Sequence, residues 1–183
     1  QLDRGHREKK WCSRFILVPI KKIYLVHSGG FSVMFWGCFS KVGLGPLVAL
    51  EGNMTGEKYI ELLKATLILI PELAAAGRPM TFMQDNAPCH TANLVKAFMA
   101  ENDIETLPWP AQSPDMNPIE TLWAIIKARR QKKFGFPKSK SDLIEQIFDI
   151  WDNIDPELVE KLADSANKRV NAVLKLKGKV SKY

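Results

Sequence analysis

A run of apolar residues at 32–39 constrains the fold of this chain more than any other segment. In an extended strand, successive side chains point to opposite faces. Both faces are apolar here, with Val33, Phe35, Gly37 and Phe39 on one and Met34, Trp36 and Cys38 on the other. We therefore predict a central strand that is covered on both sides. Gly43 and Gly45 predict a turn, and residues 46–50 the returning strand of a hairpin.

The middle of the chain predicts a helix and then a short strand–helix–strand unit. Residues 55–70 form the expected first helix, capped by Thr55, and its buried stripe is Tyr59, Leu63, Thr66 and Ile70. Short strands are predicted at 80–83 and 104–107, with a helix at 91–101 between them. The expected buried side of that helix is Leu94, Val95, Phe98 and Met99. Such a short unit predicts a parallel, right-handed crossover.

A proline-rich connector follows. Residues 108–118 contain four prolines, so we expect a stiff segment without regular structure. A helix is predicted to begin directly after it, with Asn117 as N-cap and Pro118 in the first helical position. Its inward stripe is Ile119, Leu122, Trp123 and Ile126. Two more helices are expected at about 142–151 and 156–173.

Together these elements predict an α/β protein with a mixed sheet flanked by helices. The 183 residues suit one domain, or one domain with an extension. We predict a core over residues 1–135 and a basic helical C-terminal extension over residues 136–183. Gln1 is not an initiator residue, so we expect a fragment or a processed product. No apolar stretch approaches the roughly 20 residues of a membrane helix and no secretory signal opens the sequence, so no membrane partner is expected.

The net charge of +6 is unevenly distributed. Residues 127–140 and 168–183 together hold 13 of the 26 Lys and Arg residues and no acid, whereas the rest of the chain holds 13 basic and 20 acidic residues. This segregation favours a polyanionic partner such as nucleic acid. A solvated helix face followed by a basic tail is the alternative. The candidate phosphate contacts are Lys127, Arg129, Arg130, Lys132 and Lys133.

The three cysteines, Cys12, Cys38 and Cys89, are far apart and form no CxxC pair. This spacing indicates neither a disulfide framework nor a zinc knuckle. A reducing intracellular compartment is therefore expected.

Two carboxylates are candidates for metal chemistry. Asp85 follows the predicted strand at 80–83, where open α/β sheets place their ligands, although an Asx-type turn alone would also explain it. Glu120 falls in the first turn of the helix after Asn117, where a capping box would also explain it. Joined by the crossover and the stiff connector, the two can converge on one point. Paired carboxylates suit a hard cation such as Mg²⁺, and two such ions can assist phosphodiester cleavage.

The segments around both carboxylates resemble motifs of the mariner superfamily of DNA transposases. Residues 84–90, QDNAPCH, resemble the second-Asp motif of that family. Residues 113–123, SPDMNPIETLW, resemble its third-acid motif in the Glu form, and 34 residues separate Asp85 from Glu120, as in that form. Residues 29–37, GGFSVMFWG, and 177–183, KGKVSKY, agree as well.

This resemblance implies an RNase H-like fold whose Asp-Asp-Glu triad binds two Mg²⁺ ions, with Mn²⁺ as a substitute. It implies cut-and-paste transposition, in which DNA is cleaved at inverted terminal repeats and the 3′ ends are joined to target DNA. The implied partners are transposon ends and target DNA, held by a homodimer in the nucleus, without a small-molecule cofactor. Asp85 and Glu120 would be catalytic metal ligands. Asn86, His90 and Asn117 would support them, with His90 orienting the loop of Asp85.

The sequence departs from the family pattern in two respects. The first Asp of the family is expected before Gln1, because Asp3 lies too close to Trp11 to match it. The helix-turn-helix region that recognises the terminal repeats is also absent. We therefore expect a core that contacts DNA without site recognition and is inactive alone. A domesticated or decayed copy that binds DNA without catalysis is the alternative.

Overall fold

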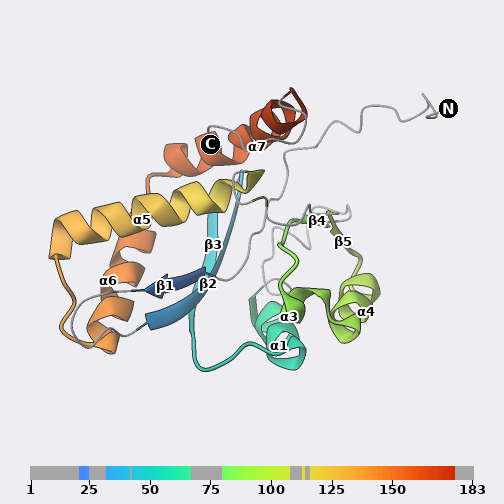
Figure 1. The fold of residues 1–183 in the computed structure, drawn as a ribbon, viewed down its shortest axis with the longest axis horizontal. Coiled ribbons are helices and arrows are strands. Elements are labelled where there is room, and N and C mark those ends of the chain that lie inside the picture. Colours follow the sequence, from blue (N-terminus) through green and yellow to red (C-terminus); the bar gives the residue numbers. More distant parts are fainter. Residues whose placement is uncertain are drawn as a thin grey trace.

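The computed structural model describes residues 21–24, 32–41, 43–66, 80–107, 113 and 116–175 (Figure 1). Among these residues the strands form two hydrogen-bonded sheets. The first is antiparallel and contains β1 (Lys21–Tyr24), β2 (Ser32–Ser40) and β3 (Gly43–Leu50). The second pairs β4 (Met80–Phe82) with β5 (Ile104–Thr106) in parallel. Both pairing directions of the predicted mixed sheet are therefore present.

Six helices surround these strands in the part of the chain that the structure describes. They are α1 (Gly56–Thr66), α3 (Pro88–Thr91), α4 (Asn93–Glu101), α5 (Pro118–Phe134), α6 (Lys140–Asp152) and α7 (Pro156–Lys175). Figure 1 shows α5, α6 and α7 grouped with the antiparallel sheet, and α1, α3 and α4 grouped with β4 and β5. None of the helices in the described ranges combines the length and hydropathy needed to cross a bilayer.

Strand β2 separates two hydrophobic cores. Phe35 and Phe39 point into a core shared with α5, α6 and α7, and the indole of Trp36 lies in a second core with α1, α4 and β4. All three side chains are fully buried. The alternation expected from the sequence is thus confirmed: β2 is a central strand covered on both faces. Its partner β1 precedes the first strand that the sequence predicted.

The predicted strand–helix–strand unit is also confirmed. Met80 pairs with Ile104 in parallel register, and Leu107 N donates to Phe82 O at 2.8 Å beyond the last pair. One prediction within this unit is wrong, because Leu94 is 40% exposed. It lies in the first turn of α4 over Gly56, which has no side chain to cover it.

The helices after the connector share the first core with the sheet. Leu122 of α5, Ile147 of α6 and Val159 of α7 belong to one buried cluster with the phenylalanines of β2. The predicted inward stripe of α5 is confirmed, since Ile119, Leu122, Trp123 and Ile126 are all buried. The domain boundary predicted at 135/136 stays a prediction. The packing nevertheless shows that α6 and α7 complete the same core as residues before that boundary.

Candidate active site

Asp85 lies just beyond the carboxyl end of β4, and its side chain is 51% exposed. Ala87 N donates to Asp85 Oδ1 at 3.0 Å, so the Asx-type turn considered as an alternative is present. This turn fixes one carboxylate oxygen while more than half of the side chain stays open to solvent. A turn and a ligand role are therefore compatible at Asp85.

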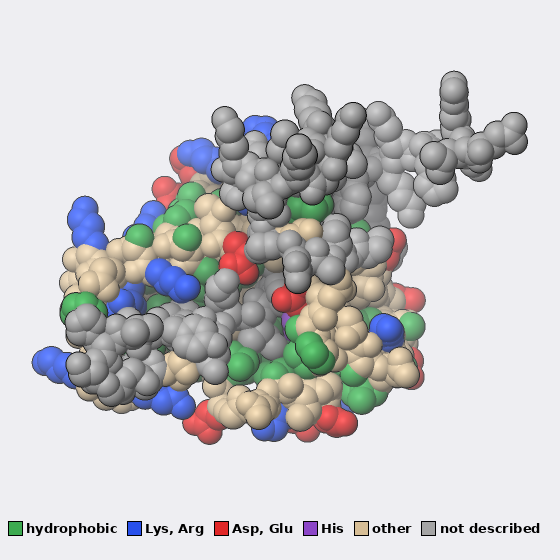
Figure 2. All heavy atoms as spheres, in the orientation of Figure 1, with side chains coloured by type: hydrophobic (Ala, Val, Ile, Leu, Met, Phe, Trp, Pro, Cys, Tyr) green, Lys and Arg blue, Asp and Glu red, His purple; other side chains and the backbone are tan. Residues whose placement is uncertain are grey.

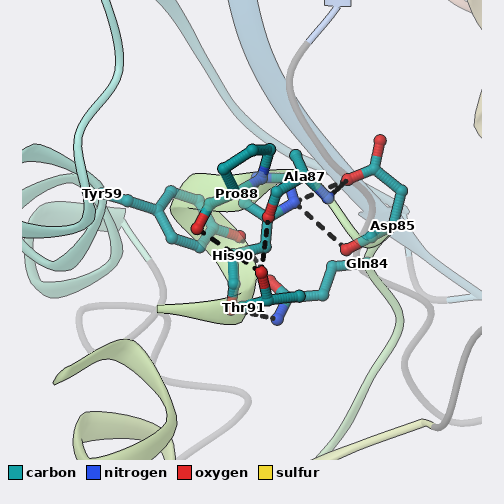
Figure 3. Close-up of polar contacts among 7 residues, drawn as sticks. All are labelled: Tyr59, Gln84, Asp85, Ala87, Pro88, His90 and Thr91. Atoms are coloured by element: carbon teal, nitrogen blue, oxygen red, sulfur yellow. Dashed lines mark hydrogen bonds and ion pairs between the residues drawn. The ribbon is translucent and has the colours of Figure 1, made fainter. Parts of the chain in front are cut away.

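His90 of α3 contacts the same carboxylate oxygen (Figure 3). Its Nδ1 lies 2.7 Å from Asp85 Oδ1 and 3.3 Å from Asp85 O. Because both oxygens are acceptors, Nδ1 carries the hydrogen and donates it to Asp85. The ring is only 1% exposed, so the donor is held rigidly by its surroundings.

Tyr59 and Gln84 hold His90 in turn. Tyr59 of α1 donates its hydroxyl to Gln84 Oε1 at 2.8 Å, and Gln84 Nε2 donates to His90 O at 3.5 Å. The rings of Tyr59 and His90 lie 4.4 Å apart in a tilted arrangement (Figure 3). The sequence indicated only that Tyr59 is buried. The sequence feature that could have drawn attention to Gln84 is its position as a polar residue at the end of the short apolar strand.

Burial sets the protonation of two groups near Asp85. It raises the pKa of Tyr59 well above the ordinary range, so the hydroxyl keeps the proton that it donates to Gln84. Burial also raises the pKa of the Cys89 thiol, and the nearby negative charge of Asp85 adds to the shift. A neutral thiol is a poor metal ligand. The exposed donors at this turn are the oxygens of Asp85.

Glu120 lies in the first turn of α5 and is half-buried. Asn117 caps this helix as predicted, because its Oδ1 accepts from Ile119 N at 3.1 Å. Glu120 N donates to Asn117 O at 3.2 Å. The cap and the buried side chains of Ile119 and Leu122 fix the backbone on both sides of Glu120.

Arg169 of α7 contacts the same turn and was missed by the sequence analysis. Its Nη2 donates to Thr121 Oγ1 at 2.7 Å and its Nε to Ser165 Oγ at 3.0 Å. The residue is only 3% exposed. Nothing in the sequence separated Arg169 from the other basic residues near the C-terminus, so this contact could not be foreseen.

The oxygen donors of Asp85 and Glu120 are of the kind that a hard divalent cation prefers. In the ranges that the structure describes, no three His, Cys, Asp or Glu side chains are grouped to hold a metal ion. In the view of Figure 1, α5 begins at its end toward β4 and runs away from it. Convergence of Asp85 and Glu120 on one ion stays a prediction. The same is true of a supporting role for Asn86, which is exposed beside Asp85.

The five predicted phosphate contacts on α5 differ in their exposure. Lys127, Arg129, Lys132 and Lys133 are exposed. Arg130 is buried, and its Nη1 donates to Gly135 O at 2.8 Å and to Gln146 Oε1 at 3.2 Å. The prediction that Arg130 contacts DNA is therefore corrected: its guanidinium joins the end of α5 to α6. Burial also lowers the pKa of Arg130 from its ordinary value.

The exposed basic residues of α5 do not form a single line. At about 100° per residue, Lys127 and Arg129 point in nearly opposite directions around the helix. Lys133 Nζ is paired with Asp149 at 2.6 Å. Figure 2 shows Lys and Arg side chains gathered at the end of the molecule where Figure 1 places the carboxyl end of α5 and the start of α6.

An α/β domain that presents a fixed carboxylate at a strand end, and a second in the first turn of a helix, is typical of metal-dependent enzymes acting on phosphodiesters. Residues 27–144 match the family described as DDE superfamily endonuclease. The match covers more than half of the chain. The chain therefore belongs to this family, and the family resemblance noted in the sequence is confirmed.

Two relatives are transposases of nematode transposable elements. The Tcb2 transposase of Caenorhabditis briggsae is 32% identical over 177 residues, which are 95% of this chain and 64% of that protein. The Tc1 transposase of Caenorhabditis elegans is 36% identical over 159 residues, which are 86% of this chain and 57% of that protein. The chain thus spans less than two thirds of the length of either relative.

The crystal structure of the catalytic domain of Mos1 mariner transposase has a similar fold. Its TM-score to this chain is 0.82 at 20% identity, over 94% of this chain and 87% of that domain. A similar match is found to the Mos1 paired-end complex with Mn, with a TM-score of 0.81 at 18% identity over 93% of this chain and 57% of that chain. The predicted RNase H-like α/β fold is therefore confirmed.

Proposed function

We propose that this chain is the catalytic core of a cut-and-paste DNA transposase that cleaves DNA and transfers strands at inverted terminal repeats. The observation that carries the proposal is the carboxylate of Asp85, which two hydrogen bonds to Oδ1 fix at the end of β4 in a DDE endonuclease. The transposases related to this chain support the same function.

In this proposal Asp85 and Glu120 bind divalent cations. Their oxygens suit Mg²⁺, with Mn²⁺ as a substitute, and structures of the Mos1 transposase catalytic domain and Raltegravir have been solved with Mg and with Mn. A pair of such ions would activate a water on one side of the phosphodiester and stabilise the leaving oxygen on the other. The residues of this chain would hold the two ligands in position. The Asx turn and His90 fix Asp85, and the cap at Asn117 fixes the turn that carries Glu120.

The partners in this proposal are transposon-end DNA and target DNA, bound by a homodimer in the nucleus. Mos1 structures include paired-end and strand-transfer complexes. In this chain Lys127, Arg129 and Lys132 are exposed on α5 and can reach phosphates. A nuclear location follows from the substrate, because transposition acts on chromosomal DNA.

The test is a titration of the 183-residue chain with Mn²⁺, followed by electron paramagnetic resonance. We expect saturable binding that Mg²⁺ displaces, and strong weakening of that binding by Asp85→Asn or Glu120→Gln. Glu105→Gln is the matched control, because Glu105 is an exposed carboxylate on the neighbouring strand β5.

The result that would overturn the metal site is equal binding by the wild type and both site variants. Retained DNA binding together with no specific Mn²⁺ site would instead favour a domesticated copy that binds DNA without catalysis. Duplex DNA binding is measured in the same samples by fluorescence anisotropy, so the two outcomes are separated.

A further inference from the structure

His90 is buried, yet only one of its two ring nitrogens has a hydrogen-bond partner. Nδ1 donates to Asp85, whereas Nε2 is buried and has no partner within the described ranges. Figure 3 shows the ring between Tyr59 and the turn of Asp85, with the contacts of Nδ1 directed to Asp85.

This arrangement has a cost in folding free energy. A buried polar atom without a partner loses its hydration and regains nothing in the folded protein. An apolar side chain of similar size would pack against Tyr59 without that loss. If His90 were replaced, Asp85 would be rehydrated, because half of its side chain is already exposed. Packing alone therefore gives no reason for a histidine at this position.

We propose that His90 is a positioning residue for the Asp85 carboxylate, and that Tyr59 and Gln84 hold His90 in place. This inference rests on the metal-binding role proposed for Asp85. Without His90, Asp85 Oδ1 would lose the 2.7 Å bond from Nδ1, and the half-exposed side chain would be less restricted to one rotamer. The metal site is weaker when the side chain of a ligand is mobile in the free protein, because binding the ion must then order that side chain.

The connection runs from the carboxylate to the interior of the protein. Tyr59 of α1 is completely buried in the second core, and its hydroxyl reaches Gln84 across 25 residues of chain. Gln84 in turn binds the backbone of His90. These contacts link the position of Asp85 to helix α1 through His90, in addition to the bond within its own loop.

The first test compares three variants of His90 in the full chain, with Mn²⁺ as the probe. His90→Leu is expected to weaken Mn²⁺ binding by about 10–100-fold, the usual effect of losing a partner that orients a ligand. Its melting temperature is expected to equal or exceed that of the wild type. His90→Asn keeps an N–H near the position of Nδ1 and is expected to retain most of the affinity. His90→Gln places its N–H farther out and is expected not to.

The second test examines Tyr59. Tyr59→Phe keeps the ring against His90 and removes the hydroxyl bond to Gln84, so we expect a smaller loss of Mn²⁺ affinity than for His90→Leu. Thr66→Val is the matched control. Thr66 is a buried residue of the same helix whose hydroxyl donates to Leu62 O at 2.6 Å, with no connection to Asp85.

The outcomes separate this inference from the proposed function. If Asp85→Asn binds Mn²⁺ as tightly as the wild type, the metal site itself is wrong. If Asp85→Asn loses binding while His90→Leu keeps it, His90 does not position Asp85 and the inference is overturned. If His90→Leu fails to fold, the Asn and Gln variants decide, because equal affinity of these two would contradict a role for Nδ1.

Discussion

Arg169 Nη2 lies 2.7 Å from Thr121 Oγ1, and this hydrogen bond joins the C-terminal helix α7 to the turn of α5 that carries Glu120. The match to the endonuclease family ends at residue 144, before α7 begins. A helix outside the matched segment therefore helps to define the geometry of a candidate catalytic turn inside it.

Arg169→Met is expected to destabilise the protein by about 1–3 kcal/mol, because the part-buried hydroxyls of Thr121 and Ser165 lose the donor that the buried Arg169 supplies. The free energy of unfolding is measured with urea. Lys161→Ala is the control, since Lys161 on the same helix forms only an exposed pair with Glu157 and its loss costs less than about 0.5 kcal/mol. Equal destabilisation by the two changes would contradict the role assigned to Arg169.

The basic residues of α5 are expected to separate into two functional groups. The double change Arg129→Ala and Lys132→Ala lowers duplex DNA affinity and reduces the slope of log affinity against log salt by up to about 1.8, with little change in stability. Arg130→Ala has the opposite pattern: it destabilises the fold by about 2–4 kcal/mol, because Gly135 O and Gln146 lose a buried donor. A salt slope that falls with Arg130→Ala in folded protein would show that Arg130 contacts DNA after all.

Gly45 is expected to tolerate no side chain while Cys38 is present. A Cβ at position 45 would lie 2.3 Å from Cys38 Sγ. Gly45→Ala therefore destabilises the protein by about 1–3 kcal/mol through overpacking. Adding Cys38→Ala opens the space and recovers part of that loss, so a double-mutant cycle shows a favourable coupling. Strictly additive effects would contradict the contact.

Alkaline pH is expected to destabilise the fold partly through Cys38. Burial raises the pKa of this thiol from 9.0 to about 12. Between these values the folded chain keeps a proton that the unfolded chain releases, so the free energy of unfolding falls as pH rises from 9 toward 12. Cys38→Ala removes this contribution and flattens that decline. Parallel curves for the two proteins, measured by urea unfolding, would refute the assignment.

The sequence predicted best those elements whose pattern is local. The two apolar faces of β2, the cap at Asn117 and the crossover around α4 each depend on a few neighbouring residues. The positions of Asp85 and Glu120 at the ends of their elements followed from the same patterns. Leu94 was wrongly predicted to be buried. Helical periodicity does not say how much of the inward face of α4 a neighbouring helix covers.

The remaining features depend on contacts between distant segments. Composition placed Arg130 among the candidate phosphate contacts and Arg169 in the basic C-terminal extension. Charge alone gives no sign that a cation will be buried against backbone oxygens or hydroxyls. Arg130 in fact continues the inward stripe of α5, and this position could have indicated that its side chain is buried. The bond from Tyr59 to Gln84 spans 25 residues and has no pattern that marks it.

The position of α7 against β2 and β3 has a consequence for synthesis of the protein. Lys41, in the turn after β2, forms an ion pair with Asp164 of α7 at 2.9 Å, across 123 residues of chain. Val159, Leu162 and Ala163 cover the same core as Phe35 and Phe39. During translation α5 and α6 can cover part of that face, but the part under Val159, Leu162 and Ala163 stays uncovered until α7 has left the ribosome. The part of the core that α7 covers is thus exposed to aggregation in the nascent chain, and chaperone dependence is expected to fall once α7 has emerged.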